Sequence, residues 1–412
     1  MKRIAIAVSL CTGMTPSVAF GLDWSIKTSE SQSVEFNSNQ FLSPTPMAAL
    51  GSYSTLTTSA EARTPTSKFI LDGDGSYKKY WGPAVDGRPS EFLNYGFRAH
   101  YEQNGKIKSD REFIEAAWRQ QSTALAILND LGISTNVGGF LDRLTASGGI
   151  DRSLSALDRV SLFATSTRTS YEPSSGGIPF TDTLVRGSWR HSLSSVASLS
   201  FSSEAELLEF DNAFNTRNQI YREQVGIDAT LSPVLSFRGN IGAAALVTKG
   251  GVSTSPIGGI VSATPVSNAV YDWIGDAVLT YRMLKTTTLT VVASQSVGPS
   301  IVGSMIKRDS ITASLNHQVN SRSSLSFSAS GNRQIATTTT DYASASATYS
   351  RTLTREWLTQ LTYRYQHRFA STGGTIIDPV TGTPTVSGTS PADSHSLLFA
   401  VTHNFVLLPS GN

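Results

Sequence analysis

Charged side chains recur in this sequence at every second position of segments whose other positions are apolar. In WLTQLTYRYQHRF, residues 357–369, Arg364 and Arg368 alternate with Tyr363 and Tyr365. A period of two is typical of a β-strand, because successive side chains point to opposite faces. Arginines gathered from several strands onto one face could line a water-filled interior that selects polar or anionic solutes.

The same alternation predicts which charged residues share the polar face. Sliding a strand by one residue would exchange its faces and place arginine against lipid, at a cost of about 2–4 kcal/mol near the bilayer midplane. We therefore assign the aromatic residues to the outside. The predicted pore-lining residues are Arg98, Arg119, Arg186, Arg190, Arg222, Arg238, Asp272, Asp276, Arg282, Arg364 and Arg368. A second interpretation stays open, in which these groups pair between neighbouring strands and stiffen or fill the interior.

Other residues that could do chemistry lack the spacing that the chemistry needs. Asp72 and Asp74 in LDGDGSYK have the spacing of a calcium loop, but no glutamate follows at its twelfth position. No two of the six histidines lie four residues apart, and neither a G-x-S-x-G elbow nor a glycine-rich phosphate loop occurs. We expect no catalytic residue, no metal and no cofactor. A Ser-His-Asp cluster assembled across strands, as in a barrel hydrolase, remains a weaker alternative.

The composition narrows the class of protein. The chain has 412 residues and a formal net charge of +2, which gives no electrostatic reason to propose nucleic acid as a partner. Its mean hydropathy is −0.11, and no apolar run of about 18 residues or more occurs, which argues against transmembrane helices. The 33 glycines and abundant serine and threonine favour strands and turns.

The N-terminus is predicted to be a signal peptide covering residues 1–21. Two basic residues precede an apolar stretch from Ile4 to Leu10, and small residues follow at Ala19 and Gly21. We expect cleavage after Gly21, or alternatively after Ala19. The remainder, 22–412, shows no linker and is predicted to be one domain.

The single cysteine, Cys11, lies inside this predicted signal peptide. The predicted mature chain therefore has no thiol, which excludes disulfide bonds, cysteine nucleophiles and thiolate metal sites. A secreted chain of this kind fits the bacterial cell envelope.

Strand-like alternation repeats along the whole domain. We expect about 18 strands (16–18), each long enough to cross a membrane at the tilt that barrels adopt. The predicted spans are 23–36, 50–62, 68–81, 91–103, 111–122, 137–148, 157–171, 181–193, 195–210, 217–230, 233–247, 270–284, 286–298, 306–318, 321–333, 339–352, 355–369 and 393–407.

The connections between these strands alternate between short and long. Tight turns near Ser232 and Lys285 alternate with the longer segments 248–268, 297–304 and 371–394. Outer-membrane barrels have short periplasmic turns and long external loops, whereas a soluble sandwich has no reason to sort its loops this way. The sequence therefore predicts an all-β, transmembrane antiparallel β-barrel in the bacterial outer membrane with both termini in the periplasm. Loops 248–268 and 371–394 are the candidates for a constriction of the channel.

Three stretches carry a resemblance to a known family. They are SQSVEFNSNQFL (31–42), AAWRQQSTALAILNDLG (116–132) and LDRVSLFATSTRTSYE (157–172). With them the chain resembles a family of bacterial outer-membrane β-barrel porins often associated with exopolysaccharide loci. The resemblance implies an outer-membrane barrel with a link to surface polysaccharide, and it identifies no binding residues.

The sequence favours a porin-like channel for polar solutes or a secreted polysaccharide, without enzymatic activity. Its expected partners are outer-membrane lipid and the transported solute. The alternative is a non-conducting structural or interaction barrel whose external loops bind a surface polymer or a partner. An interior formed by about 18 strands is wide enough for an aqueous channel unless loops fold into it.

Overall fold

The computed structural model describes most of the predicted domain. The described residues are 23–86, 90–105, 110–124, 126, 139–173, 177–211, 216–249, 268–299, 305–335, 339–370, 375–377, 384–386 and 390–408. The predicted signal peptide 1–21 lies outside them. So do most of the predicted constriction loop 248–268 and much of 371–394.

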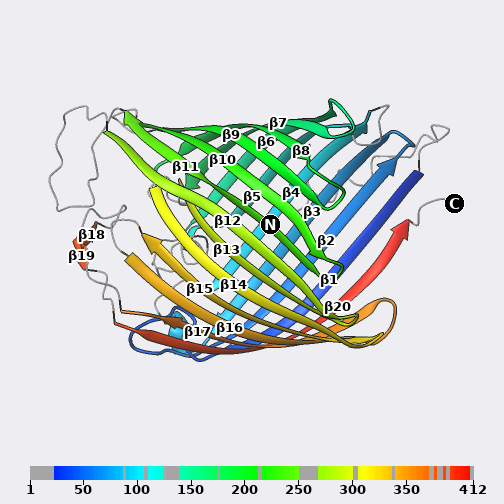
Figure 1. The fold of residues 1–412 in the computed structure, drawn as a ribbon. Coiled ribbons are helices and arrows are strands. Elements are labelled where there is room, and N and C mark those ends of the chain that lie inside the picture. The colour runs from blue at the N-terminus through cyan, green and yellow to red at the C-terminus, as the bar shows by residue number, and fades with distance from the viewer. Residues whose placement is uncertain are drawn as a thin grey trace, which may run out of the picture.

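Eighteen antiparallel strands form one closed barrel (Figure 1). Each strand pairs with the next along the chain, and the last strand closes the ring by pairing with the first. The strands are β1 (Asp23–Asn37), β2 (Ala49–Arg63), β3 (Ser67–Trp81), β4 (Glu91–Asn104), β5 (Arg111–Ser122), β6 (Phe140–Ser153), β7 (Asp158–Glu172), β8 (Phe180–Ser192), β9 (Ala197–Phe210), β10 (Arg217–Ser232), β11 (Leu235–Lys249), β12 (Asn268–Leu284), β13 (Thr287–Pro299), β14 (Met305–Asn320), β15 (Ser323–Ile335), β16 (Thr339–Thr352), β17 (Trp357–Arg368) and β20 (Ala392–Leu408). The predicted fold class is confirmed.

Three short elements lie outside the barrel wall. The 3-10 helix η1 (Pro83–Val85) follows β3, and β18 (Thr375–Ile377) pairs with β19 (Pro384–Val386) between β17 and β20. Among the described residues, no helix is long and apolar enough to span a membrane.

All connections longer than six residues lie at one end of the barrel, as the sequence predicts, although that end also carries the short connections 300–304 and 336–338. One end, which we call the turn end, carries 64–66, 105–110, 154–157, 193–196, 233–234, 285–286, 321–322 and 353–356. The other, the loop end, carries 38–48, 82–90, 123–139, 173–179, 211–216, 250–267, 300–304, 336–338 and 369–391. The first residue of β1 and the last residue of β20 both lie at the turn end.

The outer face of the wall is apolar because each strand places its large hydrophobic side chains on one side. On β4, Leu93, Phe97 and Tyr101 are exposed, whereas Arg98 and the buried Phe92 occupy the other face. Residues paired in register share a face, so this assignment passes from strand to strand around the ring. The aromatic side chains of segment 357–369 also face outward, because Tyr363 on β17 pairs in register with the exposed Leu397 on β20.

One predicted strand, 137–148, has the wrong bounds, because the strand is β6, Phe140–Ser153. Gly139 has a φ of 99°, a left-handed conformation that ends the preceding loop. The later glycine pair, Gly148 and Gly149, continues the strand. A Cβ at Gly149 would lie 2.5 Å from Cε1 of Phe113, so glycine is needed there for the close approach of the ring.

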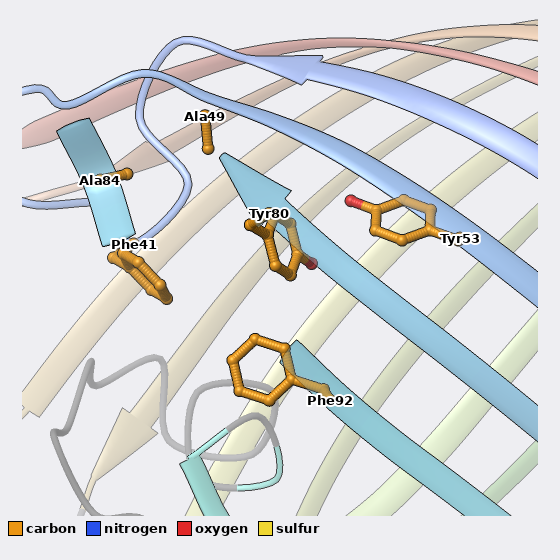
Figure 2. Close-up of a cluster of buried hydrophobic side chains, with 6 residues drawn as sticks. All are labelled: Phe41, Ala49, Tyr53, Tyr80, Ala84 and Phe92. Atoms are coloured by element: carbon orange, nitrogen blue, oxygen red, sulfur yellow. The ribbon is translucent and has the colours of Figure 1, made fainter. Parts of the chain in front are cut away.

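Two hydrophobic clusters lie inside the barrel near the loop end. The first, the tyrosine cluster, consists of Phe41, Ala49, Tyr53, Tyr80, Ala84 and Phe92 (Figure 2). The Tyr80 ring makes edge contacts with Tyr53 at 5.6 Å and with Phe92 at 5.8 Å. Because Phe41 comes from the segment 38–48 and Ala84 from η1, both connections fold inward over β2, β3 and β4.

The second cluster shows that a hairpin tip also folds inward. Phe180, Leu208 and Ile220 form a buried cluster on β8, β9 and β10, and Met305 packs against it. Met305 is the first residue of β14, four to six strands further along the wall. The loop end of the β13–β14 hairpin therefore bends into the interior, where it narrows the space between opposite walls.

Candidate functional site: the barrel interior

Strands β20 and β1 to β6, together with the turn 353–356, line a cavity of about 1200 Å³ in the interior. Its charged lining residues are Lys27, Asp72, Asp74, Arg98, Arg119, Arg143, Arg355 and Glu356. The strand register explains this grouping. Residues Ser29, Thr57, Asp74, Gly96, Arg119 and Arg143 follow one another across β1 to β6, and Lys27, Ser59, Asp72, Arg98, Ala117 and Thr145 form the adjacent row.

The arginines of this cavity are partly neutralised. Arg98 donates from Nε to Asp72 at 2.9 Å, and Arg119 donates from Nη2 to Asp74 at 2.7 Å. Asp72 and Asp74 are thus partners of arginines rather than part of a calcium loop. Lys27 forms no ion pair within the described part of the chain. The cavity has five cationic and three anionic side chains, an excess of two positive charges.

A second group of charged residues lies near the loop end of β8 to β10. Glu204 and Glu206 are buried, with side-chain exposures of 6% and 4%. Arg186 donates from Nε to Glu204 at 2.6 Å, and Arg222 binds both carboxylates, with 2.6 Å between its Nη2 and Glu206. The same Nη2 donates to the carbonyl of Val297 on β13 at 2.6 Å. Arg222 therefore holds the inward-bent hairpin tip against this wall.

Closer to the turn end, Asp228 joins two further predicted arginines. Arg190 contacts its Oδ2 at 3.2 Å and Arg238 contacts the same oxygen at 2.9 Å. On the same strand as Arg238, Asn240 donates to Asp276 on β12 at 3.0 Å. Two neighbouring groups of contacts therefore lie along this wall, one around Asp228 and one between Asn240 and Asp276.

The remaining predicted residues are not brought into these groups. Arg364 on β17 binds the buried Glu35 on β1 at 3.0 Å, and Arg368 lies near the loop end of the same strand. Arg282 is exposed near the turn end of β12. Asp272 lies near the loop end of β12 and is paired with Lys307 at 2.8 Å. Whether the predicted residues line a conducting pore stays a prediction.

The wall formed by β13 to β16 has a different character. Its inward positions carry hydroxyl groups that pair between strands, at 2.8 Å for Ser294 and Ser310, 2.8 Å for Ser328 and Ser346, 2.7 Å for Ser330 and Ser344, and 3.0 Å for Thr348 and Thr362 on β17. We call this surface the hydroxyl wall. In the strand order it lies across the ring from the charged strands β5 to β9. Each hydroxyl both donates and accepts, so the wall can exchange hydrogen bonds with a passing solute.

The interior offers little for catalysis or metal binding among the described residues. His100 contacts Glu115 at 3.0 Å and Glu102 at 3.6 Å, and its ring stacks on Phe113. No serine hydroxyl is hydrogen-bonded to it in the part of the chain that the structure describes. No group of three or more potential metal ligands occurs within the described residues either.

Several interior residues were not named by the sequence reasoning. Glu204 and Glu206 lie an even number of residues from Ser198 on β9. The alternation along this strand would therefore have placed both on the inner face. Arg143 lies inside the predicted strand 137–148 and alternation places it on one face, but it was not named among the pore-lining residues. The inward aromatic residues Tyr53 and Tyr80 had no signal, since the aromatic side chains were all assigned to the outside.

Comparison with known proteins adds overall similarity in fold. No family model matches the chain, and no curated protein matches it. Among solved structures, the iron transporter FrpB from Neisseria meningitidis (F5-1 variant) is similar, with 7% sequence identity and a TM-score of 0.48. The alignment covers 93% of this chain and 82% of the FrpB chain. Pseudomonas aeruginosa OprD has 10% identity and a TM-score of 0.45, with 95% and 98% covered. Acinetobacter baumannii OccAB2 has 9% identity and a TM-score of 0.46, with 93% and 98% covered. These similarities assign no residue and no solute to this chain.

Proposed function

We propose that this chain is an outer-membrane β-barrel channel that passes polar solutes. The observation that supports this most strongly is that the closed barrel has a polar inner face and an apolar outer face. Large side chains on the outer face are strongly exposed, for example Ile241 at 67% and Trp273 at 58%. An apolar surface of this extent is unstable in water and is covered by hydrocarbon in a membrane.

The two interior walls favour hydroxylated, uncharged solutes. Most charges of β3 to β11 are bound to opposite charges next to them, so they present a weak net field to a neutral solute. Along the opposite side, the hydroxyl groups of the hydroxyl wall are paired with one another, and each pair keeps further donor and acceptor capacity for a solute. A sugar, including a segment of a secreted polysaccharide, matches such a surface because its hydroxyl groups can exchange hydrogen bonds with successive serines.

The test is liposome swelling with purified protein and uncharged sugars of increasing size. We expect swelling in small sugars and a cutoff as size increases. The variant Ser344→Leu places an apolar side chain on the hydroxyl wall and should slow sugar entry, whereas the matched variant Ala99→Leu on the outer face of β4 should not. Equal sugar entry in both variants, or none in the original protein, would contradict the proposal.

A second candidate is a barrel that does not conduct. The observation that favours it is the pair of interior clusters, since segments 38–48 and the β13–β14 tip both occupy space inside the ring. Conductance in planar bilayers separates the two candidates, because a blocked barrel carries no ion current. Binding of a surface polymer by intact cells, with no current in bilayers, would favour this second candidate.

The orientation follows from the sorting of connections. We place the loop end outside the cell and the turn end, with both chain ends, in the periplasm, as in barrels with short periplasmic turns. An epitope inserted after Thr375 should be labelled on intact cells, whereas one inserted after Leu353 should be labelled only after permeabilisation. The reverse pattern would invert the assignment.

A further inference from the structure

The wall of the barrel is interrupted between β12 and β13 near the loop end. β12 pairs with β11 from Asn268 onward, but its pairing with β13 begins only at Gly275 and Gln295. Residues 268–274 of β12 therefore have no partner in β13, and we call this break in the wall the seam. β13 departs from the wall here because the β13–β14 tip bends into the interior, as the packing of Met305 shows.

The seam lies within the part of the wall that faces hydrocarbon. Tyr271 and Tyr281 face outward on β12 and are 76% and 38% exposed, as expected for aromatic residues at the two edges of the apolar band. A strand tilted as in outer-membrane barrels rises about 25 Å between them, which is the height of that band. Gly275 then lies about 15 Å above Tyr281, so the seam opens in the half of the band nearer the loop end.

Apolar side chains lead to the seam from the inside of the barrel. Ile220 on β10, Leu246 on β11 and Val270 on β12 follow one another in register. Residues in register share a face, and Ile220 belongs to the second hydrophobic cluster, so this row lies on the inner surface. Its last member, Val270, is 57% exposed at the edge of the seam. An apolar strip therefore crosses part of the inner wall and ends where the wall is interrupted.

The outer wall carries a hollow of about 710 Å³ beside the seam. Trp273 and Gly275 line it from β12, and Ala293 and Gln295 line it from β13. It extends over β14, where Ile311 is exposed. Because several of these residues are small, bilayer hydrocarbon can reach the backbone at the foot of the seam. Apolar surface thus lies on both sides of the break, on the inner strip and on the outer wall.

Two polar side chains of the β13–β14 hairpin close the seam. Gln295 donates from Nε2 to the Trp273 carbonyl at 2.7 Å, and Lys307 pairs through Nζ with Asp272 at 2.8 Å. From Gly275 toward the turn end, the same two strands are joined by a backbone ladder. Side-chain contacts can open locally while such a ladder stays formed, so the hairpin tip can move away from β12 without unfolding the ring.

We propose that the seam is a side passage through which the hydrocarbon chain of an amphiphile moves between the interior and the outer leaflet. The chain lies on Ile220, Leu246 and Val270 and takes the place of Met305, while the polar head remains among the charged residues of the interior. This contact removes the apolar surface of both the chain and the strip from water. Sugars gain nothing from such a strip, so this passage is an activity separate from that of the channel.

The experiment uses a phosphatidylcholine whose acyl chain ends in a photoreactive diazirine, mixed into liposomes that hold the purified protein. After irradiation, mass spectrometry of peptides locates the labelled residues. Because the phospholipid stays in the bilayer, its chain reaches the inward-facing Leu246 and Val270 only through the seam. We expect label on both of these residues as well as on the outward-facing Tyr271. Label confined to outward-facing residues would overturn the proposal. Equal label on Ser344 of the hydroxyl wall would do so as well, because chains would then enter elsewhere.

Two pairs of variants on the inner face of β12 test the passage further, with the label on Tyr271 as the internal standard. Asp272→Ser removes the partner of Lys307 and should raise the label on Leu246 several-fold. The matched control is Asp276→Ser, which lies where β12 and β13 are paired and should leave that label unchanged.

The second pair changes the apolar strip itself. Val270→Glu places a charge at the seam end of the strip and should remove most of the label from Leu246. Val278→Glu lies on the same face of β12 within the paired region and should not. All variants must keep the different gel mobility of boiled and unboiled barrel. Equal label on Leu246 in Asp272→Ser and Asp276→Ser, or in the two glutamate variants, would contradict the proposal. Sugar entry into liposomes is measured separately, so this passage can be absent while the channel function stands.

Discussion

Arg222 on β10 donates a hydrogen bond of 2.6 Å to the carbonyl of Val297 on β13, so one side chain connects two strands that do not pair in the barrel wall. The guanidinium group at the same time binds the buried Glu204 and Glu206. This contact joins the β13–β14 tip to the wall formed by β9 and β10.

We predict that Arg222→Lys enlarges the channel. A lysine keeps a positive charge beside the two carboxylates but has a single nitrogen, which cannot reach both of them and the Val297 carbonyl together. The tip should then be released, and single-channel conductance in planar bilayers should rise. Arg222→Met removes the cation from two buried carboxylates and should lower the free energy of unfolding by about 3–5 kcal/mol. Unchanged conductance in Arg222→Lys would show that the tip is not held by this residue.

Ion selectivity is predicted to depend on Lys27 rather than on the paired arginines. Lys27 lines the cavity of β1 to β6 and has no ion-pair partner among the described residues, whereas the charge of Arg98 is offset by Asp72. Lys27→Glu should shift the reversal potential in a salt gradient toward cation preference. The control Lys79→Glu lies on the outer face and should leave the reversal potential unchanged. An equal shift in both variants would refute the assignment.

The opposite shift is expected for Glu35→Gln. Glu35 is buried and accepts hydrogen bonds from the Tyr53 hydroxyl and from Arg364, the latter at 3.0 Å. Removing its charge leaves Arg364 unbalanced, so anion preference should increase. Loss of a charged hydrogen-bond acceptor in a buried place should also lower the free energy of unfolding by about 1–3 kcal/mol. Both effects can be measured on the same sample, by reversal potential and by urea titration of tryptophan fluorescence.

Gly149→Ala should destabilise the barrel because the added Cβ would overlap the Phe113 ring. Overpacking of this kind costs about 1–3 kcal/mol. The second variant Phe113→Leu removes the ring edge and should recover part of the loss. Gly187→Ala, where no atom lies within 4 Å of the added Cβ, is the matched control and should be neutral. If Gly149→Ala has the same urea midpoint as Gly187→Ala, the close packing is not present in solution.

Much of the fold could be predicted because alternation and connection length are local properties of the sequence. The facing of Arg364 and Tyr363 follows directly from the period of two, and it holds in β17. The bounds of β6 were wrong because Gly148 and Gly149 look like a strand end. Only the presence of Phe113 on the neighbouring strand explains why glycines continue that strand.

The interior could be predicted less well because its content depends on contacts between distant segments. The alternation places Arg222 inside, but the contact with Val297 depends on a bend in another hairpin. Tyr53 and Phe92 are buried on the inner face because segment 38–48 and η1 fold over them. The alternation within the strands does not predict how these connections fold. Which arginine meets which acid requires the register between strands, which the sequence pattern leaves open.

The bend of the β13–β14 tip has a consequence for the wall itself. The ladder between β12 and β13 stops at Gly275 and Gln295, whereas β13 and β14 remain paired up to Pro299 and Met305. The Gln295 side chain donates to the Trp273 carbonyl at 2.7 Å where the backbone ladder ends. From Gly275 toward the loop end, the backbone of β12 has no hydrogen-bonding partner in β13. We therefore expect hydrogen–deuterium exchange in the barrel wall to be fastest for the amides between these two strands.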